Sequence, residues 1–98
     1  MDNKKPTKVT ITKKDVKKAI KSLKLGELPS QCCPMWQALN RLGMTGKFVV
    51  GGETIEQGRG TIATFSPRLP AWLYLADEWP HCLAVNYEMP SFKVKWLK

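Results

Sequence analysis

Between residues 16 and 23, apolar residues recur every three or four positions. At about 3.6 residues per turn they fall on one face of a helix: Val16, Ala19, Ile20 and Leu23. Thr12 is placed to cap the first turn, with Asp15 completing a capping box, and Gly26 is the expected stop. The pattern therefore predicts a short strand at 8–11 and a lysine-rich helix at 13–24.

A second helix is indicated by a proline. Pro34 suits the first helical position, because its φ is near the helical value and its missing N–H has no partner at a helix start. Cys33 then becomes the cap residue, and Gly43 ends a helix of roughly nine residues. We expect its apolar residues to be buried: Trp36, Ala38, Leu39 and Leu42.

From residue 47 the pattern changes from helical to extended. β-branched and aromatic runs alternate with glycines up to residue 66, which predicts a three-strand antiparallel meander. The glycines at 51–52 and on either side of Arg59 are interpreted as hairpin residues with positive φ. A phosphate-binding loop is the alternative, but neither GxGxxG nor GxxxxGK occurs in the sequence.

The last third of the chain predicts one more helix and two more strands. Pro70 is placed to begin a short helix that runs to Asp77, and Pro80 is placed to stop it. Apolar and polar residues then alternate at 81–88 and again at 92–96, as they do in strands. The final run is interpreted as an edge strand whose lysines discourage pairing with other chains.

These elements predict one α+β domain over residues 1–98, with a small, mainly antiparallel sheet of four or five strands and about three helices. Hydrophobic residues make up 43% of the 98 residues, enough for a single modest core. No apolar run approaches the roughly 20 residues of a membrane helix, and MDNKKPTK holds no apolar segment, so we expect neither a membrane helix nor a signal peptide. Three cysteines, two of them adjacent, do not suit a disulfide framework. We expect a cytoplasmic protein with reduced thiols.

The net charge of +8 is unevenly distributed. The N-terminal arm and helix (1–25) hold nine lysines against two aspartates, a net charge of +7. The body (26–98) holds seven basic against six acidic residues, a net charge of +1. This asymmetry predicts an anionic partner, which can be a nucleic acid, a nucleotide or an acidic protein surface. The alternative is that the lysines form a solvated face that only keeps the protein in solution.

Two sets of residues are candidates for contacting such a partner. Cations of the first helix and of two later turns are the candidates for binding an anion: Lys13, Lys14, Lys17, Lys18, Lys21, Arg59 and Arg68. Tryptophans are the candidates for stacking on a base: Trp36, Trp72 and Trp79.

Catalytic and metal chemistry find little support in the sequence. Four residues have the atom types of a zinc site: Cys32, Cys33, His81 and Cys82. Adjacent cysteines usually point apart, however, so the spacing argues against a metal. Cys33 at a helix N-terminus could have a lowered pKa and act as a nucleophile, but no third group is evident to orient a base. We expect no cofactor, no metal and no enzymatic activity.

Four short motifs follow one another over roughly residues 9–90: an ITxxD strand-helix start, Cys33-Pro34 before Ala38-Leu39, a helix from Leu69-Pro70 to Asp77, and a closing strand that ends in proline. In this order they resemble a group of small uncharacterised proteins encoded by tailed bacteriophages and prophages. The lysine-rich first helix and the doubled cysteine depart from that pattern. The resemblance implies a phage accessory gene, of a kind that often encodes inhibitors of host defence, and it carries over no catalytic residues.

Two classes of function follow from these observations. The first is a non-enzymatic phage counter-defence protein that binds an anionic target, either a nucleotide immune signal or an acidic surface of a host defence complex. The second is a nucleic-acid-binding accessory protein that uses the basic helix on phosphates. Against the second, the aromatics do not interleave with the lysines as in a single-strand stacking platform. No membrane partner is expected, and self-association is left open.

Overall fold

The computed structural model describes residues 5–84 and 89–97. In chain order its elements are β1 (Lys8–Thr10), α1 (Lys13–Lys24), η1 (Pro29–Gln31), α2 (Pro34–Arg41), β2 (Val49–Val50), β3 (Thr54–Gln57), β4 (Gly60–Ser66), α3 (Ala71–Tyr74), η2 (Ala76–Glu78), α4 (Trp79–Ala84) and β5 (Ser91–Trp96).

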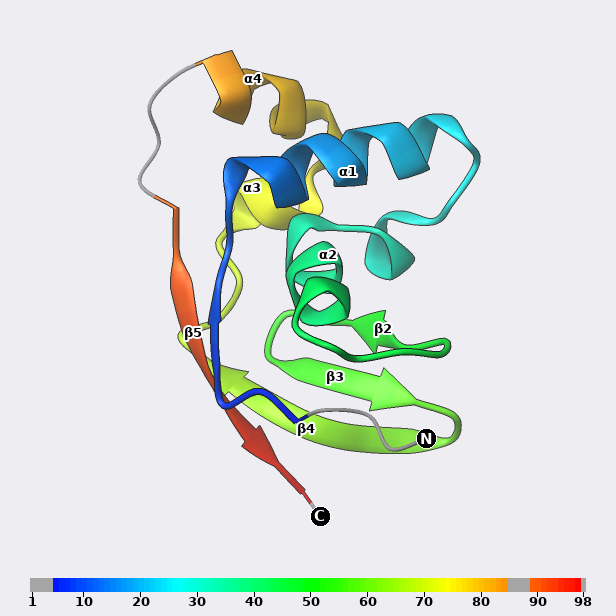
Figure 1. The fold of residues 1–98 in the computed structure, drawn as a ribbon, viewed down its shortest axis with the longest axis vertical. Helices are drawn as coiled ribbons and strands as arrows, with labels where there is room; N and C mark the ends of the chain where they lie inside the picture. Colours follow the sequence, from blue (N-terminus) through cyan, green and yellow to red (C-terminus); the bar gives the residue numbers. More distant parts are fainter. Residues whose placement is uncertain (1–4, 85–88, 98) are drawn as a thin grey trace.

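One five-stranded antiparallel sheet organises the chain, with strand order β1-β5-β4-β3-β2 (Figure 1). The predicted meander is confirmed as β2, β3 and β4. The prediction that the last strand forms an edge is wrong, because β5 lies between β1 and β4, with Val9 opposite Phe92 and Phe65 opposite Val94. The predicted α+β class is confirmed.

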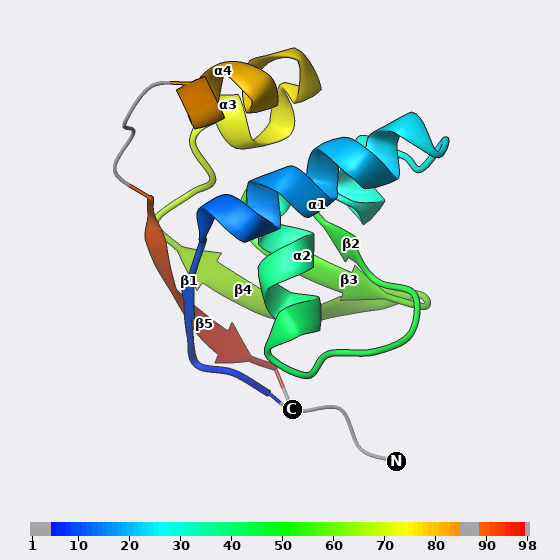
Figure 2. The same ribbon diagram turned by 45° about the horizontal axis from the view of Figure 1, so that its top comes forward.

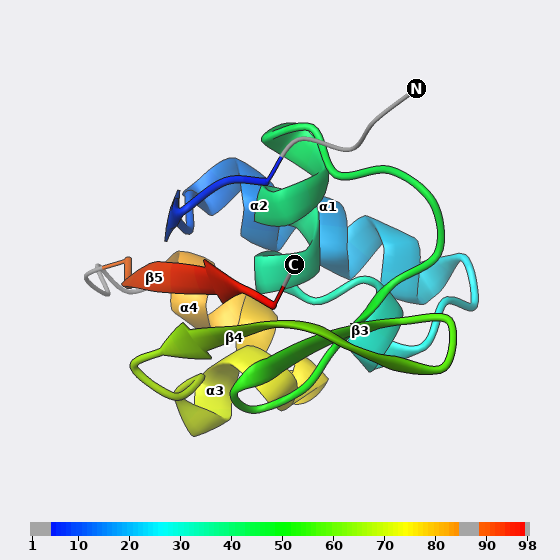
Figure 3. The same cartoon turned by 90° about the horizontal axis from the view of Figure 1, so that it is seen from below.

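The sheet curls around α2. Seen from below, β5, β4 and β3 form a curved wall, and α2 lies on its inner side (Figure 3). α1 packs against α2 and α4 at one end of the sheet, and α3 lies beside α4 (Figure 2). Along β5 the side chains of Phe92 and Val94 are buried and those of Lys93 and Lys95 are exposed, so alternation divides the strand between core and solvent.

The predicted capping box at the start of α1 is confirmed. The Asp15 backbone N–H donates to Thr12 Oγ1 at 3.2 Å, and the Thr12 N–H donates to Asp15 Oδ2 at 2.9 Å. Val16 and Ala19 of the predicted stripe are fully buried, and Gly26 follows the helix with a φ of 95°. Within the part of the chain that is described, neither α1 nor any other helix is long and apolar enough to cross a bilayer.

α2 also begins as predicted. Pro34 is its first residue and Cys33 is the N-cap, whose sulfur accepts the Trp36 backbone N–H at 3.4 Å. The helix ends at Arg41, close to the predicted glycine stop. Its buried side includes Ala38 and Leu39, which pack in the core.

The region after β4 differs from its prediction. The helix expected to run from Pro70 to Asp77 is interrupted: Pro70 is a cap, α3 has four residues, and η2 follows. The prediction of a strand at 81–88 is wrong for residues 81–84, which belong to α4. Residues 85–88 lie outside the described residues. The prediction that Pro80 stops a helix is also wrong, because Pro80 is the second residue of α4, where its missing N–H costs no helical hydrogen bond.

The two hairpin turns use glycine for different reasons. Gly58, between β3 and β4, has the expected positive φ of 65°. The expectation of positive φ is wrong for Gly51, Gly52 and Gly60. Gly51 lies in close contact with Thr54 instead: a Cβ there would lie 3.0 Å from Thr54 Oγ1, and the Gly51 N–H donates to the Thr54 carbonyl at 2.8 Å.

Candidate functional site

The exposed side of α1 carries only lysines over about 140° of its circumference, at about 100° per residue. We call this surface the lysine face: Lys13, Lys14, Lys17, Lys18, Lys21 and Lys24, all of them exposed. The one acidic residue of α1, Asp15, is buried on the other side. The structure therefore places five of the predicted anion-binding residues on one surface.

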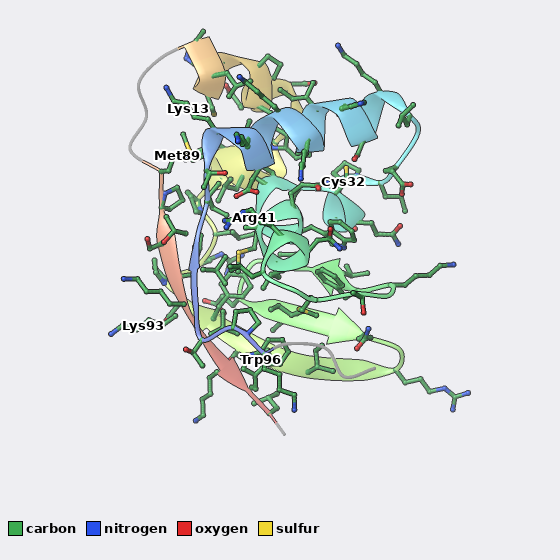
Figure 4. All side chains as sticks on the ribbon, in the orientation of Figure 1. Lys13, Cys32, Arg41, Met89, Lys93 and Trp96 are labelled. Atoms are coloured by element: carbon green, nitrogen blue, oxygen red, sulfur yellow. The ribbon has the colours of Figure 1, made fainter. Side chains whose placement is uncertain are left out.

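An ion pair beneath α1 fixes the orientation of the lysine face. Asp15 is 1% exposed, and Arg41 of α2 reaches it with Nε to Oδ1 at 3.2 Å and Nη2 to Oδ2 at 3.2 Å. The same Nη2 donates to the Thr10 carbonyl at 2.9 Å, so one guanidinium joins β1, α1 and α2 (Figure 4). The sequence analysis missed this pair, because no local pattern relates residues 15 and 41.

The two arginine candidates lie away from the lysine face. Arg59 is exposed on the β3–β4 turn, which lies at the opposite end of the molecule from α1 in Figure 1. Arg68 follows β4, with Nη1 4.0 Å from Glu53 Oε1 and both side chains exposed. The structure does not bring the predicted cations together into one cluster.

The three tryptophan candidates also separate. Trp79 is fully buried and its Nε1 donates to the Leu73 carbonyl at 3.1 Å, so the prediction that it stacks on a ligand is wrong. Trp36 is half-buried, stacked on Phe48 with ring centroids 4.8 Å apart, and its Nε1 donates to the Phe48 carbonyl at 2.9 Å. Trp72, in α3, is half-buried.

Three further lysines are exposed on strands β1 and β5, where the alternation of buried and exposed residues puts them on the solvent side of the sheet. We call Lys8, Lys93 and Lys95 the sheet lysines. Lys8 lies directly opposite Lys93, and Lys93 points away from the body of the protein (Figure 4). Such a like-charge pair is mildly unfavourable by itself. The alternating pattern predicts that Lys93 and Lys95 are exposed. Because it also suggested an edge strand, the sequence did not predict that these lysines lie beside Lys8 on a second basic surface.

A pocket of about 570 Å³ opens between the end of α1, α2 and the β2–β3 region. We call it the α1–β3 pocket, and it is lined by Ser22, Glu27, Gln31, Cys32, Trp36, Gln37, Gly46, Lys47, Phe48, Val49, Glu56 and Gly58. Trp36 is the one stacking candidate that reaches it, and no predicted anion-binding residue does. Two carboxylates against one ammonium give the wrong sign of charge for a nucleotide phosphate.

The cysteines are buried thiols. Burial raises the pKa of Cys33 to about 11, and this effect outweighs the hydrogen bond from the Trp36 N–H, which lowers it. This contradicts the alternative in which the helix N-terminus lowers the pKa of Cys33 and makes the thiol a nucleophile. Burial likewise raises the pKa of Cys32, with a further contribution from Glu27. Among residues 5–84 and 89–97, no group of three or more His, Cys, Asp and Glu side chains could hold a metal ion.

The Cys33 thiol makes the free energy of unfolding depend on pH in the alkaline range. Its folded pKa of about 11 lies above the ordinary value of 9.0, so its contribution is complete below pH 9 and is lost as the pH rises through 11. We expect the free energy of unfolding, measured with urea, to fall by about 2 kcal/mol across this window on account of Cys33. Cys33→Ser keeps a capping oxygen but does not titrate there, so it should show a smaller fall. An equal fall in both proteins would contradict the assignment.

Comparison of the chain with protein-family models, with curated proteins and with solved structures found no match.

Proposed function

We propose that this chain is a non-enzymatic phage accessory protein that inhibits a host defence complex by docking its lysine face on an acidic surface of that complex. The anionic character of the partner is supported by the lysine face itself, which combines six exposed cations on one ordered helix. The phage setting rests on the motif resemblance.

Two exposed leucines favour a protein partner over a nucleic acid. Leu25, the residue after Lys24, is 78% exposed, and Leu28 is 59% exposed. Exposed apolar side chains rimmed by polar residues are typical of protein interaction sites. Phosphate binding needs no such leucines. This adjacency of lysines and leucines is the observation that carries the proposal.

Two other features weigh against the alternatives. The α1–β3 pocket holds more carboxylates than cations, which disfavours sequestration of a nucleotide signal. The raised pKa of Cys33 leaves its thiol protonated at neutral pH, which supports a role without nucleophilic catalysis.

Changing Lys14, Lys17 and Lys21 to glutamine tests the lysine face. Because these side chains are exposed, the melting temperature should stay within a few degrees, at about 0.5 kcal/mol or less per substitution. Affinity purification from host cells should recover a partner with the native protein and lose it with the variant. Phage protection in cells that carry the targeted defence should fall in parallel. Leu25→Ser with Leu28→Ser should weaken recovery without changing the net charge.

Nucleic-acid binding remains the second candidate, because the sheet lysines give the molecule a second basic surface. The matched variant changes Lys93 and Lys95 to glutamine and leaves α1 intact. If the partner is a protein docked on α1, this variant should still recover it. A mobility shift of random duplex DNA at nanomolar protein and about 150 mM salt, with a log-log salt slope of about −4 or steeper, would contradict the proposal and favour nucleic acid.

A further inference from the structure

The α1–β3 pocket has a charge opposite to that of the molecule as a whole. The chain carries +8, yet the charged residues of the pocket are Glu27, Glu56 and Lys47. The Glu56 carboxylate accepts a hydrogen bond from Thr54 Oγ1 at 3.4 Å, which restricts its position on β3. Glu27 is close enough to Cys32, another lining residue, to raise the pKa of that thiol. A locally negative recess thus lies within a basic protein.

The end of helix α1 forms one side of the pocket, where Ser22 of its last turn lies in the wall. Gln37 is held in the wall, with its Nε2 donating to the Cys32 carbonyl at 3.2 Å and to Ser22 Oγ at 3.4 Å. These two hydrogen bonds hold this side of the pocket in position without a ligand.

The aromatic wall of the pocket is also fixed in advance. Trp36 is held by its stack on Phe48 and by the hydrogen bond from its Nε1 to the Phe48 carbonyl. Phe48 is 1% exposed, so the half-buried indole supplies most of the aromatic surface that a ligand can meet. An indole face attracts cations, with guanidinium groups among the best partners.

We infer that the α1–β3 pocket binds an organic cation, a guanidinium or amine on a small apolar body. The cationic group pairs with the carboxylates of Glu27 and Glu56, and the body lies against Trp36. The volume of about 570 Å³ falls within the usual range for small-molecule sites. This site is separate from the lysine face and does not depend on the function proposed for it.

Calorimetric titration with butylguanidinium, and with its uncharged analogue butylurea, tests the inference. We expect butylguanidinium to bind about tenfold more tightly than butylurea, and Glu27→Gln and Glu56→Gln each to weaken it about fivefold. Glu53→Gln is the matched control, because Glu53 is an exposed carboxylate outside the pocket. Equal binding of the two probes, no binding at millimolar concentration, or an equal loss in the Glu53→Gln variant would overturn the inference.

Two further titrations complete the test. One distinguishes an arginine side chain from a free cation, and the other shows whether binding depends on the lysine face. If the natural ligand is an arginine side chain of a partner, a short arginine peptide should bind more tightly than butylguanidinium, and if it is a free amine or guanidine the order should reverse. Either order supports a cation pocket. The Lys14, Lys17, Lys21 variant should bind butylguanidinium as the native protein does, so failure of the lysine-face proposal and failure of this one give different results.

Discussion

Replacing Arg41 with alanine is expected to lower the free energy of unfolding by about 3 kcal/mol, because the Asp15 carboxylate, 1% exposed, loses its charge partner. The carboxylate keeps the hydrogen bond from the Thr12 N–H to Oδ2, and the Thr10 carbonyl loses its Arg41 donor. For a chain of this size the loss corresponds to a melting temperature lower by about 15 °C. Urea and thermal denaturation measure both quantities.

A double-mutant cycle shows whether the pair is responsible. Asp15→Asn removes the charge while keeping a side chain that can cap, so Asp15→Asn with Arg41→Ala should cost less than the sum of the two single changes. Lys14→Ala, on the exposed side of the same helix, should change stability by no more than about 0.5 kcal/mol. Additive effects at positions 15 and 41 would show that the two side chains act independently.

Replacing Trp79 with alanine should cost about 4 kcal/mol, enough to unfold a marginal domain of this size. The indole is fully buried, and its removal leaves a large cavity and deprives the Leu73 carbonyl of its donor at 3.1 Å. Circular dichroism and urea denaturation would detect the loss. Trp79→Phe, which fills most of the volume but donates no hydrogen bond, should cost about half as much.

Trp72→Ala is the matched control, because Trp72 is half-buried while Trp79 is fully buried. It should cost less than about 2 kcal/mol. If the two alanine variants proved equally stable, the placement of Trp79 in the core would be wrong, and its role as a stacking residue would have to be reconsidered.

The first half of the fold was predictable because its signals are local. The capping box of Thr12 and Asp15, the proline start of α2 and the lysine periodicity of α1 all lie within a few residues of the structure they specify. Periodicity at about 3.6 residues per turn also identified the lysine face before any contact was known. The meander of β2 to β4 was predictable for the same reason, since its strands are neighbours in sequence and in space.

The remaining features depend on contacts between distant residues. Pro80 is compatible with either a helix start or a helix stop, and the interpretation as a stop concealed α4. The central position of β5 follows from pairing with β1, which no local pattern encodes. The burial of Trp79 and the joining of Glu27 and Glu56 in one pocket are likewise consequences of tertiary packing.

The pairing of β1 with β5 also constrains how the chain acquires its structure during synthesis. Thr10 Oγ1 and Ser91 Oγ lie 2.9 Å apart although 81 residues separate them, and Trp96 Nε1 donates to the Pro6 carbonyl across 90 residues. β1 leaves the ribosome first but cannot be paired until β5 has emerged, and until then β4 has an open edge. Such long-range pairing raises the contact order, so folding should be slower than in a helical bundle of this size and should be completed only after β5 has been translated.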